Sequence, residues 1–388
     1  MSDQKAFLEF FAGGGMVRQA LGAGWTCHFA NDFDGKKALS YQENWGIKGE
    51  LCVSDIRDVD PGVLGSDIDL AWASFPCQDL SLAGRGRGLK SERSGMFFVF
   101  WQKLMAAAKS GAAPKLVVIE NVCGMLTSNR GDDFRYVIDT FSEMGYFVGG
   151  LVIDAKEFVP QSRKRVFIIG VRKDRDIDPV FVSSKPNDIY HAKSLVRAAD
   201  TLRPSSRTDW VWFNLPRPVY RTNTLSDILE SSDKVVWNTP EKTQTILSKM
   251  SEVNRGKVQA AKNKKSPVVG ALFMRTRQQN GEKRVFAEIR FDGVSGCLRT
   301  PNGGSSKQSI LWVDGDDIRS RLLTPRETAR LMGLPDSYKL PKNDTAAYHL
   351  TGDGVAVPVV EHLSRYLLEP LVCEGVLSLR HVKVTTRS

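Results

Sequence analysis

Short apolar runs alternate with amphipathic segments over residues 1–172. The apolar runs predict strands, which cover residues 6–12, 26–32, 69–75, 115–122 and 166–172. The amphipathic segments predict helices, which cover residues 16–24, 36–45 and 95–110. The run KLVVIENV is apolar at most positions, which is typical of a strand in a sheet buried on both faces. The alternation of strands and helices therefore predicts an α/β fold with a doubly wound, mostly parallel sheet.

This regular pattern ends after residue 172. Residues 173–230 are rich in loops and prolines, and residues 248–310 are basic and rich in glycine. Between Lys249 and Lys307 there are 13 Lys or Arg residues against 4 Asp or Glu residues. We therefore expect a second, smaller and irregular region here.

Helical patterns return near the C-terminus, at residues 322–335 and 354–372. Thr324, Pro325 and Glu327 have the spacing of a capping box with proline in the first turn. The predicted domains are therefore residues 1–172 together with 323–388, and residues 173–322.

Composition narrows the class of protein. The 388 residues carry a formal net charge of +10, which suits a polyanionic partner such as nucleic acid. The six cysteines are widely spread, without a CxxC pair or a zinc-type spacing with histidine. We therefore expect a reducing compartment, no disulfide framework and no metal site. We find neither a signal peptide nor an apolar run of about 18 residues, and so expect a cytoplasmic protein that does not enter a membrane.

The stretch FFAGGGM (10–16) follows a predicted strand and opens a predicted helix. Glycines at such a turn let a ligand approach the backbone, although a plain tight turn has the same composition. Asp32 lies about 20 residues further on, where an acid suits a ribose hydroxyl pair or simply caps a turn. Asp55 follows another apolar stretch, and no lysine follows the glycines, unlike a Walker-type loop. Together these positions predict an adenosine-type cofactor without a polyphosphate.

Three further motifs fall near predicted strand ends, where open α/β sheets bind ligands: PCQ (76–78), ENV (120–122) and QSRKR (161–165). Each has an ordinary structural explanation, because a lone cysteine is usually a small buried apolar residue, Glu120 can cap a helix, and arginines can be surface charges. A thiol, a carboxylate and an alternating arginine pair are also the groups that attack on an electron-poor heterocycle would use.

With these motifs the chain resembles the bacterial cytosine-5 DNA methyltransferases. The segments that carry the resemblance occur in the family's order: FAGGG, NDFD, SDI, SFPCQDLS, ENV, QSRKR, RLLTPRETARLMGLP and GDGVAVP. The resemblance implies a Rossmann-like, S-adenosylmethionine-dependent methyltransferase. It implies that residues 1–172 and 323–388 form the catalytic and cofactor-binding domain and that residues 173–322 form the target-recognition domain, which reads DNA. It also implies methyl transfer to carbon 5 of a cytosine within a short specific sequence of double-stranded DNA.

By the family's mechanism, Cys77 attacks carbon 6 of a cytosine that has been flipped out of the duplex. Glu120 binds ring N3 and the exocyclic amine, and Arg165 with Arg163 holds the base oxygen. The residues implied to contact S-adenosylmethionine are Phe11, Gly13, Gly15, Asp32, Phe33, Asp55, Ile56, Phe75, Met96, Asp353 and Val355.

Two positions depart from the family's pattern. Met16 replaces a glycine of the first motif and is expected to crowd the first helical turn. Asp353 replaces the usual asparagine, and a carboxylate accepts hydrogen bonds but donates none. Neither departure touches Cys77 or Glu120, so we expect activity.

Two basic segments are candidates for DNA contacts. The loop at 79–95 predicts a lid over DNA or, alternatively, a plain surface loop. The base-reading candidates lie in the smaller domain, because arginine makes bidentate contacts with guanine, although some of these charges are expected to be solvated. The candidates are Gln78, Ser81, Arg85, Arg87 and Lys90 in or beside the loop, and Arg275, Arg277 and Arg299.

Two alternatives remain open. A tRNA cytosine-5 methyltransferase has a similar architecture, although those enzymes are usually shorter in the recognition region. A catalytically silent DNA-binding relative would lack Cys77 or Glu120, and both residues are present. The favoured interpretation is a monomeric modification enzyme of a restriction-modification system, paired functionally with an endonuclease that it does not bind.

Overall fold

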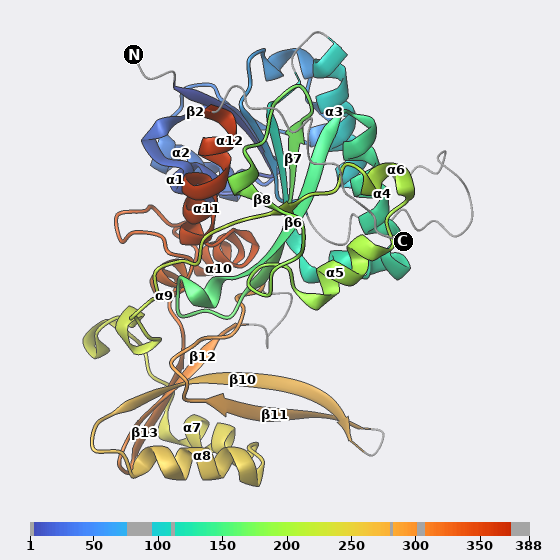
Figure 1. Ribbon diagram of the computed structural model, residues 1–388. Coiled ribbons are helices and arrows are strands. Elements are labelled where there is room, and N and C mark those ends of the chain that lie inside the picture. The colour runs from blue at the N-terminus through green and yellow to red at the C-terminus, as the bar shows by residue number, and fades with distance from the viewer. Residues whose placement is uncertain (1–3, 76–94, 110–112, 280–281, 301–306, 374–388) are drawn as a thin grey trace, which may run out of the picture.

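The computed structural model describes residues 4–75, 95–109, 113–279, 282–300 and 307–373 (Figure 1). Its main feature is a seven-stranded sheet in the order β3-β2-β1-β4-β5-β7-β6. The strands are β1 (Lys5–Phe10), β2 (Trp25–Asp32), β3 (Leu51–Val53), β4 (Leu70–Ala73), β5 (Leu116–Val122), β6 (Tyr146–Asp154) and β7 (Lys164–Arg172). All neighbours are parallel except that β7 runs antiparallel to both β5 and β6. The predicted mostly parallel sheet is therefore confirmed.

Helices cover both faces of this sheet (Figure 1). One core contains Trp72 and Val118, and the helices that share it are α1 (Met16–Leu21), α9 (Pro325–Leu331) and α11 (Val357–Leu363). The other core contains Ala71 and Val117, and the helices that share it are α3 (Met96–Lys109), α4 (Asp132–Glu143) and α5 (Lys193–Asp200). Neighbouring residues of β4 and β5 thus point to opposite cores, as the alternation along a strand requires. The doubly wound arrangement is confirmed.

The hydrophobic pattern does not predict β6. Its two central glycines, Gly149 and Gly150, weaken the strand signal. They are needed because residues 209–213 run close beside this strand: a Cβ on Gly149 would lie 2.3 Å from the carbonyl oxygen of Val211. Residues 178–216, which the pattern groups with the smaller domain, thus lie against the large sheet through short elements. These are β8 (Val182–Ser183), α5, α6 (Pro204–Arg207) and β9 (Trp212–Phe213). The division of the chain into two functional domains stays a prediction.

The smaller region contains a four-stranded antiparallel sheet in the order β11-β10-β12-β13. Its elements are α7 (Pro240–Ser248), α8 (Glu252–Lys262), β10 (Val268–Gln279), β11 (Glu282–Arg290), β12 (Ser309–Asp314) and β13 (Asp317–Leu322). Figure 1 shows this sheet apart from the large one, with α7 and α8 on its far side. The expected smaller region is present, and it is more regular than the sequence predicts.

The C-terminal part begins with the predicted capping box, in which Thr324 and Glu327 cap α9 reciprocally. After α10 (Asp344–Asp353), the single helix expected at 354–372 is divided into α11, a π-helical turn at Ser364–Leu368, and α12 (Glu369–Cys373). The change of pitch precedes Pro370, which has no N–H for the helical hydrogen bond. Among the described residues, no helix is both long enough and apolar enough to cross a membrane.

Candidate active site

The carboxyl ends of the parallel strands β1, β2, β4 and β5 meet at one edge of the large sheet. Because β7 is antiparallel, its first residues lie at the same edge, and Arg165 stands opposite Val122 of β5. The topology therefore gathers candidates that are far apart in sequence at the edge where open α/β sheets bind ligands. These candidates are Phe11, Asp32, Phe75, Glu120 and Arg165.

The glycine loop turns sharply after β1. Phe11, Gly13 and Gly15 have φ values of 60°, 56° and 75°, in the left-handed region that favours glycine. For a Cβ on Gly13, the nearest described atom is Lys37 Cδ at 3.9 Å, whereas a Cβ on Gly15 would lie 2.4 Å from Trp45 Nε1. Gly15 is therefore required by packing, and Gly13 leaves its backbone open to a ligand.

Asp32 lies beside this loop with its carboxylate oriented by the backbone. The N–H groups of Gly13 and Asp34 donate to its two oxygens at 2.8 Å each. Burial raises the pKa of the Asp32 carboxyl, while the two N–H bonds act in the opposite direction. Each carboxylate oxygen can accept a second hydrogen bond, so Asp32 fits a pair of ribose hydroxyls. The adjacent Phe33 is 72% exposed and leaves a free aromatic ring next to it.

Asp55 is already engaged by its own neighbour. Arg57 donates to its carboxylate from Nε at 2.9 Å and from Nη2 at 2.5 Å. These side-chain hydrogen bonds are the main reason why the pKa of Asp55 is lowered to about 2. The adjacent Ile56 is buried in the core beneath the edge. Asp55 and Ile56 are thus both held in place directly after β3, the first by Arg57 and the second by the core.

The segment that contains Asp353 and Val355 returns to the glycine loop. Asp353 accepts hydrogen bonds from Lys37 Nζ at 2.7 Å and from the Thr300 hydroxyl. A Cβ on the following Gly354 would lie 2.3 Å from the Met16 sulfur. Met16 therefore packs into the space that this glycine leaves, and Val355 is buried in the same core.

Glu120 and Arg165 form an ion pair at the sheet edge, with 3.0 Å between Glu120 Oε1 and Arg165 Nε. The next residue of β5, Asn121, donates from Nδ2 to the carbonyl oxygen of Phe75 at 3.0 Å. This bond ties the main chain at Phe75, two residues before Cys77 in the sequence, to the end of β5. The Phe75 ring also lies 6.2 Å from that of Phe11, edge to face.

Several of the predicted site residues lie outside the described residues. They are Cys77, Gln78, Ser81, Arg85, Arg87 and Lys90. Met96 itself is half-buried at the first turn of α3. The described chain on both sides, at Phe75 and Met96, packs into one core.

Arg163 lies near the ion pair, since Cys297 Sγ contacts both arginines, but its guanidinium holds three backbone carbonyls. Its guanidinium donates to the carbonyl oxygens of Leu298 at 2.9 Å, Gly352 at 3.1 Å and Gly354 at 2.7 Å. Burial lowers its pKa to about 10, so the group stays charged at neutral pH. Arg163 thus ties the end of the smaller region and the C-terminal segment to the large sheet.

Gln161 begins the QSRKR motif, but the sequence reasoning gave it no role of its own. It is fully buried, donates from Nε2 to the Leu331 carbonyl at 2.8 Å, and accepts from the Leu298 N–H at 3.0 Å. Its side chain therefore shares Leu298 with Arg163. The signal that could have revealed it is the spacing of Gln161, Arg163 and Arg165 at every second position, which is typical of one face of an extended segment.

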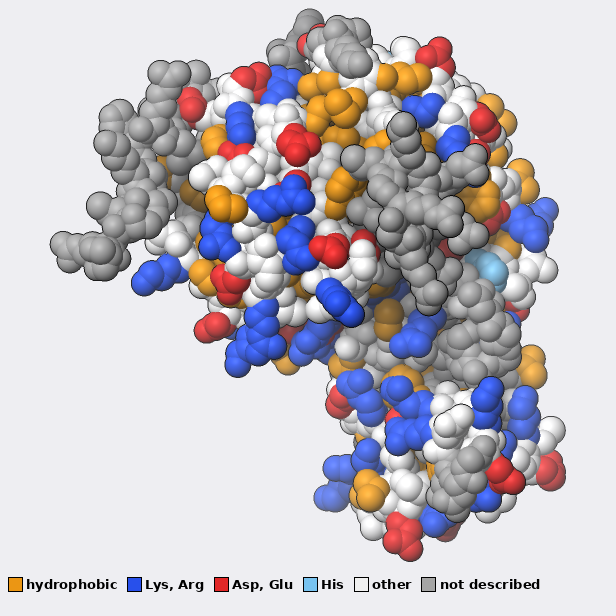
Figure 2. Space-filling view, turned by 90° about the vertical axis from the view of Figure 1, so that its right-hand side faces the viewer, with side chains coloured by type: hydrophobic (Ala, Val, Ile, Leu, Met, Phe, Trp, Pro, Cys, Tyr) orange, Lys and Arg blue, Asp and Glu red, His pale blue; other side chains and the backbone are white. Residues whose placement is uncertain are grey.

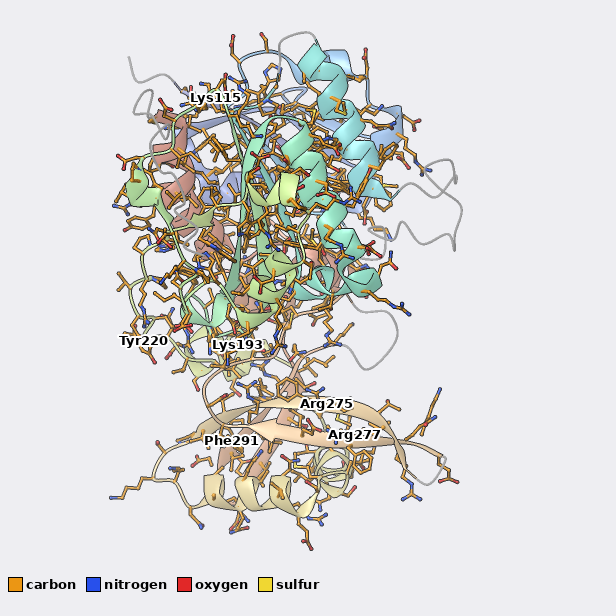
Figure 3. All side chains as sticks on the ribbon, turned by 45° about the vertical axis from the view of Figure 1, so that its right-hand side comes forward. Lys115, Lys193, Tyr220, Arg275, Arg277 and Phe291 are labelled. Carbon is orange, nitrogen blue, oxygen red and sulfur yellow. The ribbon has the colours of Figure 1, made fainter. Side chains whose placement is uncertain are left out.

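An open cleft of about 760 Å³ leads from this edge along the smaller region. Ser162 and Cys297 line the cleft, and Cys297 Sγ lies 4.0 Å from Arg165 Nη1. The candidates Arg275 and Arg277 reach it from β10 (Figure 3), and Arg299 also lines it. Figure 2 shows Lys and Arg side chains gathered over the smaller region. The cleft is thus lined by basic side chains and reaches Cys297, next to Arg165.

A family model described as "C-5 cytosine-specific DNA methylase" matches residues 5–369. The chain belongs to this family of cytosine-5 methylases. It is 26% identical over 392 residues to the type II methyltransferase M.HpaII of Haemophilus parainfluenzae, covering 96% of this chain and 91% of that protein. It is 27% identical over 362 residues to the type II methyltransferase M.HhaI of Haemophilus parahaemolyticus, covering 92% of each.

Solved structures support the same fold. The S. pombe Dnmt2 methyltransferase matches with a TM-score of 0.60 and 19% identity, over 95% of this chain and 99% of that one. A putative DNA modification methyltransferase encoded within an E. coli prophage matches with a TM-score of 0.53 and 18% identity, over 95% and 100% of the two chains. The predicted family and fold class are therefore confirmed, whereas the roles of single residues stay predictions.

Proposed function

We propose that this protein transfers a methyl group from S-adenosylmethionine to carbon 5 of a cytosine within a short specific sequence of double-stranded DNA. The observation that carries the proposal is the Glu120–Arg165 ion pair at the end of β5, together with the bond from Asn121 to Phe75. The pair supplies a carboxylate and a guanidinium at this strand end, and the Asn121 bond ties the chain at Phe75, two residues before Cys77 in the sequence, to the same strand. The type II methyltransferases that the chain resembles also favour a modification enzyme of a restriction-modification system.

In this proposal the cytosine base stands between Cys77 and Glu120. In its protonated form Glu120 donates a hydrogen bond to ring N3, and its other oxygen accepts one from the exocyclic amine, which together withdraw electron density from carbon 6. The Cys77 thiolate then forms a bond to carbon 6, and the electron pair of the 5,6 double bond makes carbon 5 nucleophilic. When bound, S-adenosylmethionine supplies an electrophilic methyl group. Loss of the carbon 5 proton to a base and expulsion of the Cys77 thiolate then restore the ring and the enzyme.

The two arginines have different roles in the proposal. Arg165 holds the Glu120 carboxylate and faces the base oxygen from the start of β7. Arg163 is a positioning residue, because its donors bind backbone carbonyls of the segments around the site. Both charges also favour the thiolate form of a nearby cysteine.

The cofactor site fits an adenosine. Gly13 gives backbone access, Asp32 offers two fixed oxygens to ribose hydroxyls, and the exposed Phe33 ring suits the face of an adenine. Asp353, held by Lys37 and Thr300, brings a carboxylate to the glycine loop. A carboxylate there suits a cationic amino or sulfonium group.

The basic cleft suits the phosphate backbone of a nucleic acid. Turning a base out of a duplex costs a few kcal/mol, which backbone contacts along the cleft must offset. We propose that Gln78, Ser81, Arg85, Arg87 and Lys90 contact DNA from the loop outside the described residues, and that the base-reading arginines act from β10 and Arg299.

The decisive experiment is bisulfite sequencing of genomic DNA from a methylation-free bacterial host that expresses this chain. The same experiment is run with the Cys77→Ser variant and with a matched control, Cys373→Ser, which changes an exposed thiol at the end of α12. We expect protected cytosines in one short context with wild type and with Cys373→Ser, and none with Cys77→Ser. A soluble protein that binds S-adenosylmethionine but protects no cytosine would overturn the DNA proposal and direct the search to tRNA.

A further inference from the structure

One acidic residue stands among the cations of the cleft. Among the described residues that line it, six are Lys or Arg and one, Glu288 of β11, is acidic. A carboxylate in the cleft lowers the attraction of the cleft for the phosphates of DNA. Phosphate binding alone therefore does not explain why Glu288 is there. Its two oxygens are divided between two arginines of the neighbouring strand: Arg275 Nε lies 2.8 Å from Oε2, and Arg277 Nη2 pairs with Oε1.

The strand geometry places these arginines side by side. Arg275 and Arg277 are two residues apart on β10, so both project from the same face of the strand, about 6.8 Å apart. Although their backbones are this far apart, both guanidinium groups converge on the Glu288 carboxylate, so the two are presented together. A two-stranded ribbon such as β10–β11 is also an element that enters the major groove.

The three side chains are accessible rather than buried. Arg275 and Arg277 are more than half exposed, and Glu288 is 27% exposed. Exposed ion pairs contribute little to folding stability, so the group is free to serve recognition. The Arg275 guanidinium also lies 5.9 Å from the centre of the Phe273 ring, which restricts its orientation further.

We infer that Glu288 is a specificity-determining residue that holds Arg275 and Arg277 in the orientation for guanine edges. An arginine recognises guanine through two parallel hydrogen bonds to O6 and N7, which requires a defined plane of the guanidinium. One carboxylate that binds both guanidinium groups supplies that orientation before DNA arrives. The inference rests on the proposed function, and it predicts guanines at two positions of the target sequence.

The residue opposite Arg277 on the neighbouring strand β11 also suits a surface that binds a polyanion. Arg284 stands directly opposite Arg277 in the ladder, and like charges in that position destabilise a free sheet. The same strand offers a matched control, because Glu282 pairs with Arg284 at the tip of β11, outside the described lining of the cleft.

The test compares wild type, Glu288→Gln and Glu282→Gln on a library of duplexes with randomised positions, with methylated contexts identified by bisulfite sequencing. We expect Glu288→Gln to lose about five-fold or more of the discrimination at one or two guanine positions while it still methylates the cognate site. Glu282→Gln should retain the wild-type profile. Arg275→Lys, which keeps the charge but not the planar fork, should lose discrimination at one of the same guanines with an unchanged salt dependence of binding.

The outcomes separate the two proposals. If wild type methylates one context and Glu288→Gln keeps the identical profile, the role of Glu288 is refuted and the proposed function stands. An equal loss in Glu288→Gln and Glu282→Gln also refutes it, because a general charge effect then explains the change. If wild type methylates no duplex, the proposed function fails and the inference fails with it.

Discussion

Removing the Glu327 carboxylate should destabilise the protein far more than removing an exposed one. Arg321 and Glu327, 2% and 0% exposed, form a double hydrogen bond of 2.7 Å and 2.6 Å where β13 leads into α9. The same carboxylate accepts from the N–H groups of Glu230 and Thr324 at 2.8 Å each. Glu327→Ala leaves the Arg321 charge buried without its partner and removes both backbone bonds. Breaking a buried pair in this way costs about 3–5 kcal/mol.

The same helix offers the control. Arg330 of α9 binds Asp336 with two hydrogen bonds of 2.7 Å, but the Asp336 side chain is 62% exposed. Asp336→Ala should therefore cost no more than about 1 kcal/mol. Urea unfolding followed by tryptophan fluorescence and by circular dichroism measures both variants. Equal unfolding midpoints for Glu327→Ala and Asp336→Ala would refute the reasoning from burial, whereas the double variant Arg321→Met/Glu327→Leu should recover part of the lost stability.

Three further predictions concern the site and its support. Burial raises the pKa of Glu9 to about 8, so the folded chain keeps a proton that the unfolded chain loses near pH 4.5. The free energy of unfolding should therefore fall as pH rises from about 4.5 to 8. Glu9→Gln should flatten this dependence, as measured by urea unfolding midpoints at pH 5, 7 and 9. Arg163→Lys should lower kcat/KM by up to about 100-fold, because one ammonium group does not match the planar guanidinium that holds three carbonyls. DNA binding should retain its salt dependence. Unchanged single-turnover rates would contradict this prediction. Asn121→Ala should lower kcat but leave S-adenosylmethionine affinity unchanged in calorimetry, since its bond fixes the Phe75 main chain; a matching loss of cofactor affinity would count against that role.

Local signals predicted the parts of the fold that depend on neighbours in sequence. The capping box at Thr324 and Glu327 forms as its spacing requires, and apolar runs such as residues 115–122 become central strands. The pattern failed at β6, because Gly149 and Gly150 are chosen for the close approach of residues 209–213 rather than for strand propensity. That requirement comes from a segment about 60 residues away, which no local window contains.

The candidate site, like the fold, was predicted from the sequence only in part. The motifs identified Glu120 and Arg165, and the fold brings them together across β5 and β7. They could not separate Arg163 from Arg165, because the distinction depends on which carbonyl groups come near each guanidinium after folding. The role of Gln161 within its motif was missed for that reason too, since its partners lie more than 130 residues away in the sequence.

The packing of α1 against α11 has a consequence for the biosynthesis of the chain. Met16 and its neighbours in α1 are covered by residues 354–363, and Trp25 donates to Glu369 at 3.2 Å. At about 5–20 residues per second, a ribosome needs roughly 15–70 s after α1 to deliver the helix that covers it. During that interval the apolar side of α1 is exposed to chaperones and to other nascent chains. All seven strands of the large sheet lie within residues 5–172, but the side of α1 that faces α11 stays uncovered until residues 354–363 have left the ribosome.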